Sequence, residues 1–587
     1  MIALHRTSAL RAILAALALT TASALPAQSY PDGKDARDGL GSGLTNAGVA
    51  MRGMRLVATA PKPVEFDSVR GLTFVNSDLA FRGNYVYQGN FAGFSIWDVS
   101  NPSQPTLASV MSCITSQGDP SIIGNLLFIS AEGGGNRNDC AKGGVQDPSQ
   151  HMAGVRIFDV SNPAAPRLVK NVQTCKGSHT HTVIPDPKDA GVVYIYVSGS
   201  QGARAEMAGC VEGTDPADES NSLFRLDVIK VPLAHPEQAE VVTGARIFTG
   251  LAAAPRRASS SNSGRPAPQV GPRNCHDVTA YPAIGLLAGA CSSYGLLVDI
   301  SNPEKPVRID AAADTNFSLW HTAVFSNDGS KVVFTDEWGG GTQPMCQASS
   351  MLEMGGNTVL TIGPDRKLTR HAYFKIPTAQ SAQENCVSHN GSLIPVPGRD
   401  IAVQGWYQGG VNIFDFTDPN KPFEIGYFDR GPIDAAPAEG ERGRGTIGGS
   451  WGAYWYNGRI YSSEMARGLD ILELVPSEHL SANEIAAAKL VWMDEFNPQS
   501  QPRVTWPAAF PVVRSYLDQL VRGNGLAAAR TGAIDAALTA AEQQSGATRK
   551  ASLTTLARTV DGDAANARDA ARVRAMAAAI RDLAAAQ

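Results

Sequence analysis

Four segments of the chain have nearly the same sequence: GFSIWDVSNPSQP (residues 93–105), GVRIFDVSNPAAP (154–166), GLLVDISNPEKP (295–306) and GVNIFDFTDPNKP (410–422). Each begins with glycine, continues as an alternating apolar stretch that ends in Asp, and closes in a turn with two prolines. Period-two alternation predicts a β-strand. The Ser-Asn-Pro or Thr-Asp-Pro step ends it, because proline cannot donate a ladder hydrogen bond and Asn or Asp favours a turn. A recurring strand-and-turn unit indicates a repeat architecture.

The spacing of these units predicts seven of them. The steps between successive motif Asp residues are 61, 68, 72 and 116 residues, and the last is twice 58, so a unit is hidden there, near NTVLTIGPD (357–365). GLDILELVP (468–476) is a further copy. Two more strand-like runs precede each copy, so we predict an all-β fold, a seven-bladed β-propeller with long loops. A β-solenoid, the alternative, would need a shorter period. The motif Asp residues are Asp98, Asp159, Asp227, Asp299 and Asp415.

The two ends of the chain differ from the repeats. Residues 1–27 have the pattern of a secretory signal peptide, with Arg6 and Arg11 before an apolar run and a small-residue cleavage site. We therefore expect a secreted or periplasmic protein without a transmembrane segment. Residues 28–70 are a polar lead-in, expected to be partly disordered or packed on the propeller (71–480). Residues 481–587 are Ala-rich with helical periodicity, which predicts a small C-terminal α-helical appendage.

Charge and cysteine content limit the possible functions. The net charge of −5 gives no basic footprint for a nucleic acid. Eight cysteines fit an oxidising compartment, and the absence of CxxC spacing argues against a thiolate metal site. Four cysteines precede the first strand of a unit and four follow a second strand, so all should lie near one rim. Of 105 connectivities the simplest joins neighbours: Cys113–Cys140, Cys175–Cys210, Cys275–Cys291 and Cys346–Cys386.

Five of the ten histidines stand where predicted inner strands begin, in SHTHTVIP, NCHDVTAYP, LWHTAVFSNDG and CVSHNGSLIPVPG. Equivalent positions on successive blades should face one another, and Glu132 and other acids lie at the same rim. Imidazoles with carboxylates suit a transition metal such as copper or zinc. Alternatively, each histidine forms a hydrogen bond inside its own blade. The candidates are His181, His276, His321 and His389 as ligands, His179 as a reserve ligand, and Asp336 or Glu337 as a supporting group or general base.

The ordered series SHTHTV, CHDVTAYP, WHTAVFSNDGSKVVFTDE, SHNGSLIP and GSWGAYWYNG, with the strand repeats, resembles exported LVIVD-repeat propellers related to choice-of-anchor B proteins. The resemblance covers about residues 70–476. It implies a secreted propeller and no established reaction. Two hypotheses follow. One is an extracellular binding module for a protein, glycan or small molecule, with a His-rich metal site at one end of the axial channel. The other is a copper or zinc oxidase or hydrolase that uses this cluster.

Overall fold

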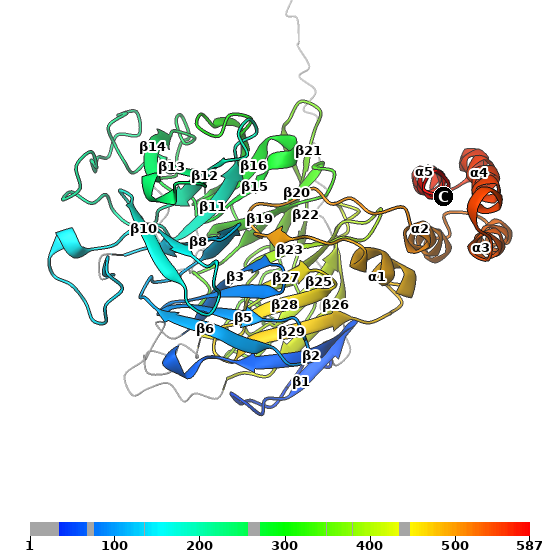
Figure 1. The fold of residues 1–587 in the computed structure, drawn as a ribbon, viewed down its shortest axis with the longest axis horizontal. Coiled ribbons are helices and arrows are strands. Elements are labelled where there is room, and N and C mark those ends of the chain that lie inside the picture. Colours follow the sequence, from blue (N-terminus) through cyan, green and yellow to red (C-terminus); the bar gives the residue numbers. More distant parts are fainter. Residues whose placement is uncertain are drawn as a thin grey trace, which may run out of the picture.

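The computed structural model describes residues 35–66, 75–133, 136–255, 270–347, 349–378, 380–433 and 447–587. The predicted signal peptide lies outside these residues. Antiparallel sheets form the body of the molecule, and five α-helices follow at the C-terminus (Figure 1). The fold is therefore predominantly β, as the repeats predict.

Five sheets follow one another along the chain, and in each of them four strands pair in chain order. The first is β3 (Asn76–Arg82), β4 (Tyr85–Asn90), β5 (Gly93–Asp98) and β6 (Thr106–Ser112). The second is β7 (Pro120–Ile123), β8 (Leu126–Ala131), β9 (Gly154–Asp159) and β10 (Arg167–Gln173). The third is β11 (Thr180–Pro185), β12 (Val192–Ser198), β13 (Leu226–Pro232) and β14 (Glu240–Ala245). The fourth is β15 (Val278–Tyr281), β16 (Leu286–Cys291), β17 (Tyr294–Asp299) and β18 (Val307–Ala313), and the fifth β19 (Trp320–Phe325), β20 (Lys331–Asp336), β21 (Asn357–Ile362) and β22 (Leu368–Phe374).

A sixth sheet has nine strands and contains two antiparallel groups. Parallel pairing of β23 with β27, at Asn390↔Gly452 and Gly391↔Ala453, joins the groups. The N-terminal strand β1 (Val49–Arg52) pairs with β26, and β2 (Met54–Pro61) pairs with β29. The predicted lead-in thus supplies the outer strand of each group. The remaining strands are β23 (Asn390–Ile394), β24 (Ile401–Gly405), β25 (Val411–Asp415), β26 (Phe423–Arg430), β27 (Ser450–Tyr456), β28 (Arg459–Glu464) and β29 (Gly468–Leu474).

The structure explains why the repeat keeps its glycine and its Asp. A Cβ on Gly93 or Gly154 would overlap a backbone oxygen of the next strand, and both residues have positive φ, at 151° and 148°. The Asp side chain accepts a hydrogen bond from the backbone N–H two residues later, at 2.7–2.9 Å in all four copies. This Asx-type bond turns the chain at the end of the strand.

The first strands of the sheets surround a common channel. In the order β3, β7, β11, β15, β19, β23 and β27, each contacts the next, and β27 contacts β3. Successive sheets bury apolar side chains between them, which is the packing of a β-propeller. The first strands run in the same direction, so their N-terminal ends meet at one end of the channel.

A segment after helix α1 (Ala482–Lys489) crosses the other end of the channel, and we name residues 493–506 the strap (Figure 1). Its strand β30 (Glu495–Phe496) pairs with β3. The Asn497 amide bonds the backbone of Ile122 in β7, and the Gln501 amide bonds that of Phe325 in β19. The predicted helical appendage (481–587) includes this segment, but the strap is bound to the propeller.

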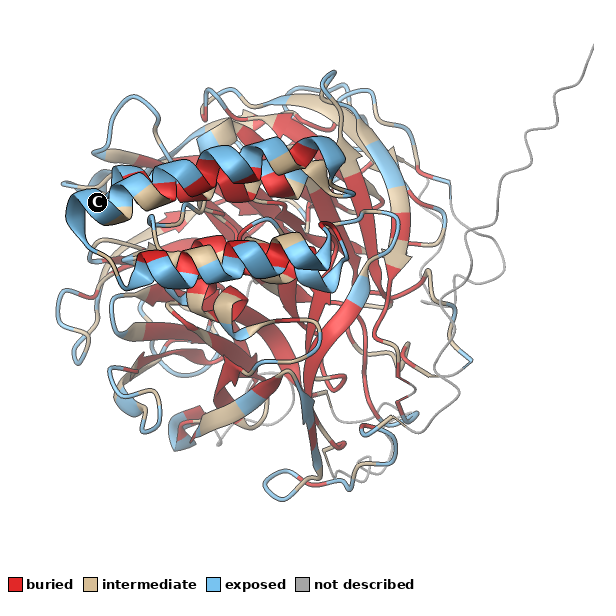
Figure 2. Cartoon of the chain, turned by 90° about the vertical axis from the view of Figure 1, so that its right-hand side faces the viewer, coloured by how far each residue is buried: buried red, intermediate tan, exposed pale blue. Residues whose placement is uncertain are grey.

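The C-terminal helices have a core of their own. Helices α2 (Phe510–Arg522), α3 (Ala528–Glu542), α4 (Gly546–Asp563) and α5 (Ala570–Ala585) pack their apolar stripes together, as the periodicity predicts (Figure 2). Polar contacts attach this bundle to the propeller: Arg522 forms an ion pair with Glu484 of α1 at 2.7 Å, and the Gln519 amide donates to the Pro397 carbonyl at 2.9 Å.

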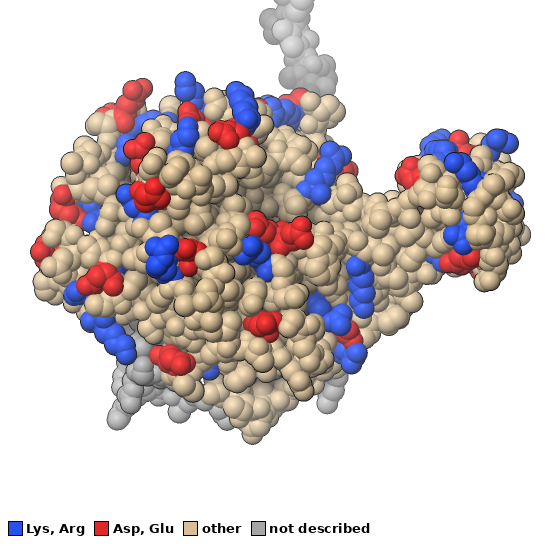
Figure 3. Space-filling view, viewed as in Figure 1, with Lys and Arg blue, Asp and Glu red and all other residues tan. Residues whose placement is uncertain are grey.

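Four disulfides join the neighbouring cysteines, Cys113–Cys140, Cys175–Cys210, Cys275–Cys291 and Cys346–Cys386, so the predicted disulfides are confirmed. Among the described residues, no helix has the length and apolar character needed to cross a membrane. On the face drawn in Figure 3, acidic and basic side chains are interspersed. This distribution agrees with the small net charge.

We expect the strap to stabilise the propeller through Asn497. Replacing Asn497 by Ala leaves the N–H and C=O of Ile122 without the partners that now lie at 2.7 and 2.8 Å. The free energy of unfolding should fall by about 1–3 kcal/mol, measured by urea denaturation. The exposed Gln238→Ala variant serves as the control. Equal stability of the two variants would contradict a stabilising role for the strap.

Candidate metal centre

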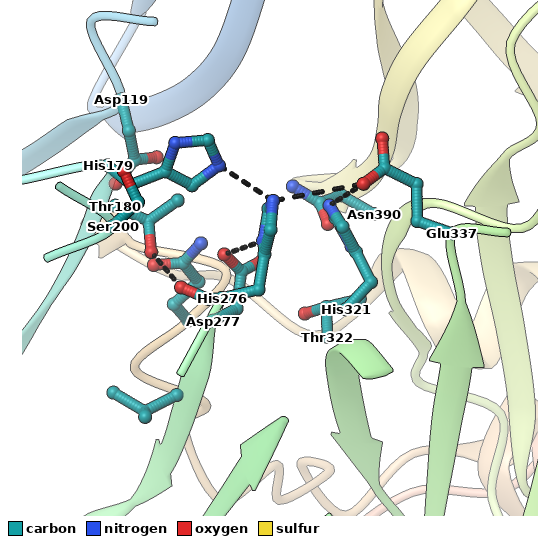
Figure 4. Close-up of polar contacts among 12 residues, drawn as sticks. Asp119, His179, Thr180, Ser200, His276, Asp277, His321, Thr322, Glu337 and Asn390 are labelled. Carbon is teal, nitrogen blue, oxygen red and sulfur yellow. Dashed lines mark hydrogen bonds and ion pairs between the residues drawn. The ribbon is translucent and has the colours of Figure 1, made fainter. Parts of the chain in front are cut away.

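Four imidazoles meet at the N-terminal ends of the first strands. Figure 4 labels three of them, His179, His276 and His321. His179, His276 and His389 lie just before β11, β15 and β23, and His321 lies in β19. Neighbouring rings are in contact: the centroid distances are 4.2 Å from His179 to His276, 3.9 Å from His276 to His321 and 4.0 Å from His321 to His389. Histidines from four successive sheets therefore form one continuous row.

The local backbone sets the position of each imidazole. The N–H groups of His179, His276 and His389 donate to carbonyls at the end of the adjacent second strand, at 2.8–3.0 Å. A disulfide cysteine lies shortly before each of the three: Cys175, Cys275 and Cys386. The cross-links thus restrain the segments from which the imidazoles project.

Three of the four imidazoles bind an oxygen acceptor through Nδ1. His179 Nδ1 lies 2.7 Å from Glu132 Oε1, and His276 Nδ1 lies 3.0 Å from Asp277 Oδ1. His389 Nδ1 bonds the Trp451 carbonyl oxygen, which can only accept, so this nitrogen carries the proton. In a neutral ring such as that of His389, an acceptor of this kind holds Nδ1 protonated and places the lone pair on Nε2, the usual arrangement of a metal-binding histidine.

The Nε2 atoms point toward one another and toward Glu337. His179 Nε2 and His276 Nε2 are 2.7 Å apart. Glu337 Oε2 lies 3.9 Å from His276 Nε2 and 3.8 Å from His321 Nε2, and Glu337 Oε1 lies 3.8 Å from His389 Nε2. In the group His321, Glu337 and His389, and in the group His276, Asp277 and His321, the possible ligand atoms all lie within 4.8 Å of one another.

His321 is the most deeply buried of these imidazoles. It is fully buried, and neither of its ring nitrogens has a hydrogen-bond partner among the described residues. Burial, reinforced by the neighbouring imidazoles, holds the pKa of His321 well below its ordinary value. Burial also lowers the pKa of His389 to about 3. Both rings are therefore neutral at physiological pH, which is the form that binds a metal.

His181 faces another way. Its Nδ1 bonds the Ser130 hydroxyl at 2.8 Å, its ring packs against Phe128, and it belongs to neither group of converging ligand atoms. His179 holds the position that the sequence prediction gave to His181. In a strand, residues two apart such as His179 and His181 would share one face. Because β11 starts at Thr180, His179 precedes the strand and this alternation does not apply to it.

The two candidate carboxylates, Asp336 and Glu337, face different surroundings. Asp336 accepts hydrogen bonds from the backbone N–H groups of Ser318, Leu319 and Gly355, each at 2.9 Å, and so fixes the surrounding loops. Glu337 instead faces the imidazoles and accepts a 2.5 Å hydrogen bond from the Tyr407 hydroxyl. A Cβ on Gly341 would overlap both the Tyr407 hydroxyl and the Glu337 carboxylate, so glycine leaves room for this pair.

The His179–Glu132 pair is electrostatically distinct from the other imidazoles. Burial alone would lower the pKa of His179, but the adjacent Glu132 charge and hydrogen bond outweigh it and raise the pKa. Burial opposes ionisation of Glu132 as well, yet His179 lowers the pKa of that carboxyl to about 2. The pair is therefore an imidazolium–carboxylate ion pair between the ordinary pKa values of the two groups, 4.5 and 6.5.

A pocket of about 440 Å³ opens onto the row of imidazoles, and His179, His276 and Glu337 line it. The sequence did not indicate three parts of the site: the Trp451 carbonyl, the Asp277 partner of His276 and the Tyr407–Glu337 bond. Asp277 lies in NCHDVTAYP and Tyr407 in GWYQGG (residues 405–410), but only tertiary contacts reveal their roles. The pocket is lined mainly by polar side chains, including Glu132, His179, Ser200, Asn274, Ser318 and Glu337.

Comparison with known proteins agrees with the fold. The LVIVD repeat family model matches residues 76–113 and 151–174. The chain contains LVIVD repeats. No curated protein matches it.

Solved propellers are similar to the chain only in outline. They include the Dos1 propeller (10% identity, 68% of this chain and 77% of that chain, TM-score 0.35). The match to the Cps50 (Swd1) propeller domain of Myceliophteria thermophila has 10% identity and a TM-score of 0.39, and it covers 72% of this chain and 100% of that chain. The match to the hydrazine synthase of Kuenenia stuttgartiensis has 12% identity and a TM-score of 0.39, and it covers 66% of this chain and 92% of that chain. At these values the similarity carries no information about function.

We expect the Glu132→Gln substitution to lower the pKa of His179, because it removes the charge and leaves the burial. The pair's contribution to stability should be complete between about pH 4.5 and 6.5. It should disappear above this window as His179 deprotonates and below it as Glu132 becomes protonated. NMR titration of the His179 ring in metal-free protein measures the change. The exposed Glu206→Gln variant is the control, and an unchanged His179 pKa would contradict the assignment.

Proposed function

We propose that the protein is an exported, seven-bladed LVIVD-repeat propeller whose histidines bind a catalytic transition metal in the pocket. The closed order of first strands and the division of the nine-stranded sheet at β23–β27 support seven blades. We extend the propeller unit to include residues 49–61 and the strap, with residues 510–587 as the helical appendage. Export rests on the signal-peptide pattern and fits the four disulfides.

One observation carries the metal proposal. The Nε2 atoms of His321 and His389 each lie 3.8 Å from a Glu337 carboxylate oxygen, and neither nitrogen has a hydrogen-bond partner among the described residues. The 2.7 Å approach of His179 Nε2 to His276 Nε2 is a hydrogen bond from the protonated His179 ring, so this contact needs no cation. Neutral, buried ring nitrogens that face a carboxylate are best explained by a bound cation.

We assign the Nε2 atoms of His276, His321 and His389, with Glu337, as the metal-holding set, and His179 as the residue that faces the pocket. Zinc or copper suits this mixture of nitrogen and oxygen. The metal would supply Lewis acidity and lower the pKa of bound water. His179 Nε2 now bonds His276 Nε2; with a metal on His276, the proton that Glu132 keeps on His179 would become available to a leaving group in the pocket. We therefore favour a metal-dependent hydrolase acting on a small polar substrate.

An oxidase is the second candidate, and Tyr407 favours it. The Tyr407 ring centroid lies 4.7 Å from that of His389, and its hydroxyl bonds Glu337. Tyr407 also has a positive φ of 53°, which a non-glycine residue adopts only where surrounding structure imposes it. A redox-active metal in the purified protein would support this reaction class over hydrolysis.

Protein purified without a His-tag or chelator should contain a bound transition metal. Each of the substitutions His321→Gln, His389→Gln and Glu337→Gln should lower the affinity for this metal about tenfold or more. His181→Gln and the half-buried His371→Gln should retain it. Elemental analysis measures the stoichiometry, and the absorption of the cobalt-substituted protein reports the ligands. Equal loss in His181→Gln and His321→Gln, with all variants folded, would contradict the assigned set. Metal-free wild-type protein after incubation with zinc and copper would refute the proposal.

The disulfides should position the ligands as well as stabilise the fold. Removing Cys346–Cys386 with serines should cost about 2–4 kcal/mol of stability and also lower metal affinity about tenfold, because His389 follows Cys386. Removing Cys113–Cys140 should cost similar stability without changing affinity, since no ligand follows Cys113. Zinc titration and thermal melting of both variants test this contrast. Equal affinity in the two would limit the disulfides to stabilisation.

A further inference from the structure

A second level of polar side chains lies in the channel one residue beyond the histidines. The backbone fixes its register: Ser130 N–H donates to the Asp119 carbonyl at 3.0 Å, and Ala290 N–H donates to the Asp277 carbonyl at 2.9 Å. Ser130 and Ala290 occupy equivalent positions in β8 and β16, so Asp119 and Asp277 are also equivalent. We name this level the carboxylate layer. Its members are Asp78, Asp119, Thr180, Asp277, Thr322 and Asn390, several of which are drawn in Figure 4.

Three carboxylates in this layer are buried without a Lys or Arg partner. Their basic neighbours are imidazoles: His276 Nδ1 lies 3.0 Å from Asp277 Oδ1, and His181 Nδ1 lies 3.5 Å from Asp119 Oδ2. Asp78 and Asp119 are each 4% exposed and Asp277 is fully buried. No Lys or Arg in the described part of the chain forms an ion pair with any of them. The Tyr454 hydroxyl and the Asn390 amide bond Asp78, and the His181 backbone N–H bonds Asp119. These neutral donors do not balance three acidic groups in a region of low dielectric.

Two oxygens in the layer lack donors. Asn390 directs Nδ2 to Asp78 Oδ2 at 2.7 Å, so its Oδ1 lies within the layer, yet no described residue donates a hydrogen bond to that oxygen. Among the described residues no group meets hydrogen-bond geometry with Asp277 Oδ2 either, although the Thr180 and Thr322 hydroxyls lie near this carboxyl. The neighbouring Thr180 hydroxyl donates to the His276 carbonyl at 2.8 Å, so its proton is already used. Buried acceptors are normally satisfied, and these two mark the place of a missing positive charge.

We propose that the carboxylate layer binds a partly hydrated divalent cation that prefers oxygen ligands, such as Ca²⁺ or Mg²⁺. Asp277 Oδ2 and Asn390 Oδ1 are the direct ligands, and Asp78 and Asp119 supply charge. Both groups of three converging ligand atoms in the described residues contain histidine, so the ion contacts few carboxylates directly and reaches the others through water. This site is distinct from the histidine centre and does not depend on the proposed function.

The cation would also support the histidines above it. Asp277 binds His276 Nδ1 through Oδ1, so an ion on Oδ2 would fix the orientation of this carboxylate. The strap covers the strand ends farther along the channel, where Gln499 O accepts from Ala280 N–H at 2.8 Å. The ion would therefore lie between the histidine centre and the strap, and it would neutralise a region that the protein itself leaves acidic.

Equilibrium dialysis of chelator-stripped full-length protein against Ca²⁺ or Mg²⁺ tests the proposal, with elemental analysis and thermal melting as readouts. The wild type should bind about one ion, and millimolar Ca²⁺ should raise its melting temperature. Asp119→Asn and Asn390→Ala should weaken binding about tenfold or more, whereas the exposed Asp147→Asn should not. His389→Gln should retain the ion, because that residue belongs to the histidine centre.

Wild-type protein that binds neither ion at millimolar concentration overturns the proposal and leaves the carboxylates neutralised by protons. Binding that His389→Gln abolishes and Asp119→Asn leaves unchanged also overturns it, since the ion would then lie at the histidines. If Asp119→Asn fails to fold, Asn390→Ala decides the outcome. Calcium or magnesium bound without any transition metal would support this site while refuting the proposed histidine centre.

Discussion

The common direction of the first strands around one channel is the constraint on which the rest of the structure depends. Because β3 through β27 contact one another in a closed order, residues at equivalent positions are brought together although they lie far apart in the sequence. Apolar side chains between successive sheets stabilise this arrangement. A polar residue on the channel side has little access to water, so its partners must come from neighbouring blades.

Each level of the channel meets this requirement differently. At the strap, the buried side-chain amides of Asn497 and Gln501 form hydrogen bonds with backbone groups at the ends of the first strands. At the histidine level, carboxylates and one carbonyl fix the Nδ1 atoms, and the Nε2 atoms face Glu337. Between these levels, three buried acids have few donors and, among the described residues, no Lys or Arg partner. The two regions with incomplete pairing are therefore adjacent, at the end where the pocket opens.

Rigidity at the histidine end has a clear origin. Backbone hydrogen bonds hold His179, His276 and His389 to the adjacent strands, and a disulfide restrains the segment before each one. On the opposite wall, Asp336 fixes the loops around Glu337 through three backbone N–H groups. Polar groups held in this way need little reorganisation when a cation or a substrate approaches. His179 and His276, both partly exposed, are the imidazoles that line the pocket.

The sequence by itself determined the repeat, the strands and turns, the neighbouring disulfides, the C-terminal helices and the row of histidines. These features follow from local alternation, spacing and residue type, which a chain carries without knowledge of its partners. Tertiary structure decided the rest. It placed His179 in the row and His181 outside it, because β11 begins between them, and it separated Glu337 from Asp336. The Trp451 carbonyl, the strap and the carboxylate layer arise only when distant strands meet around the channel, so no local pattern could have revealed them.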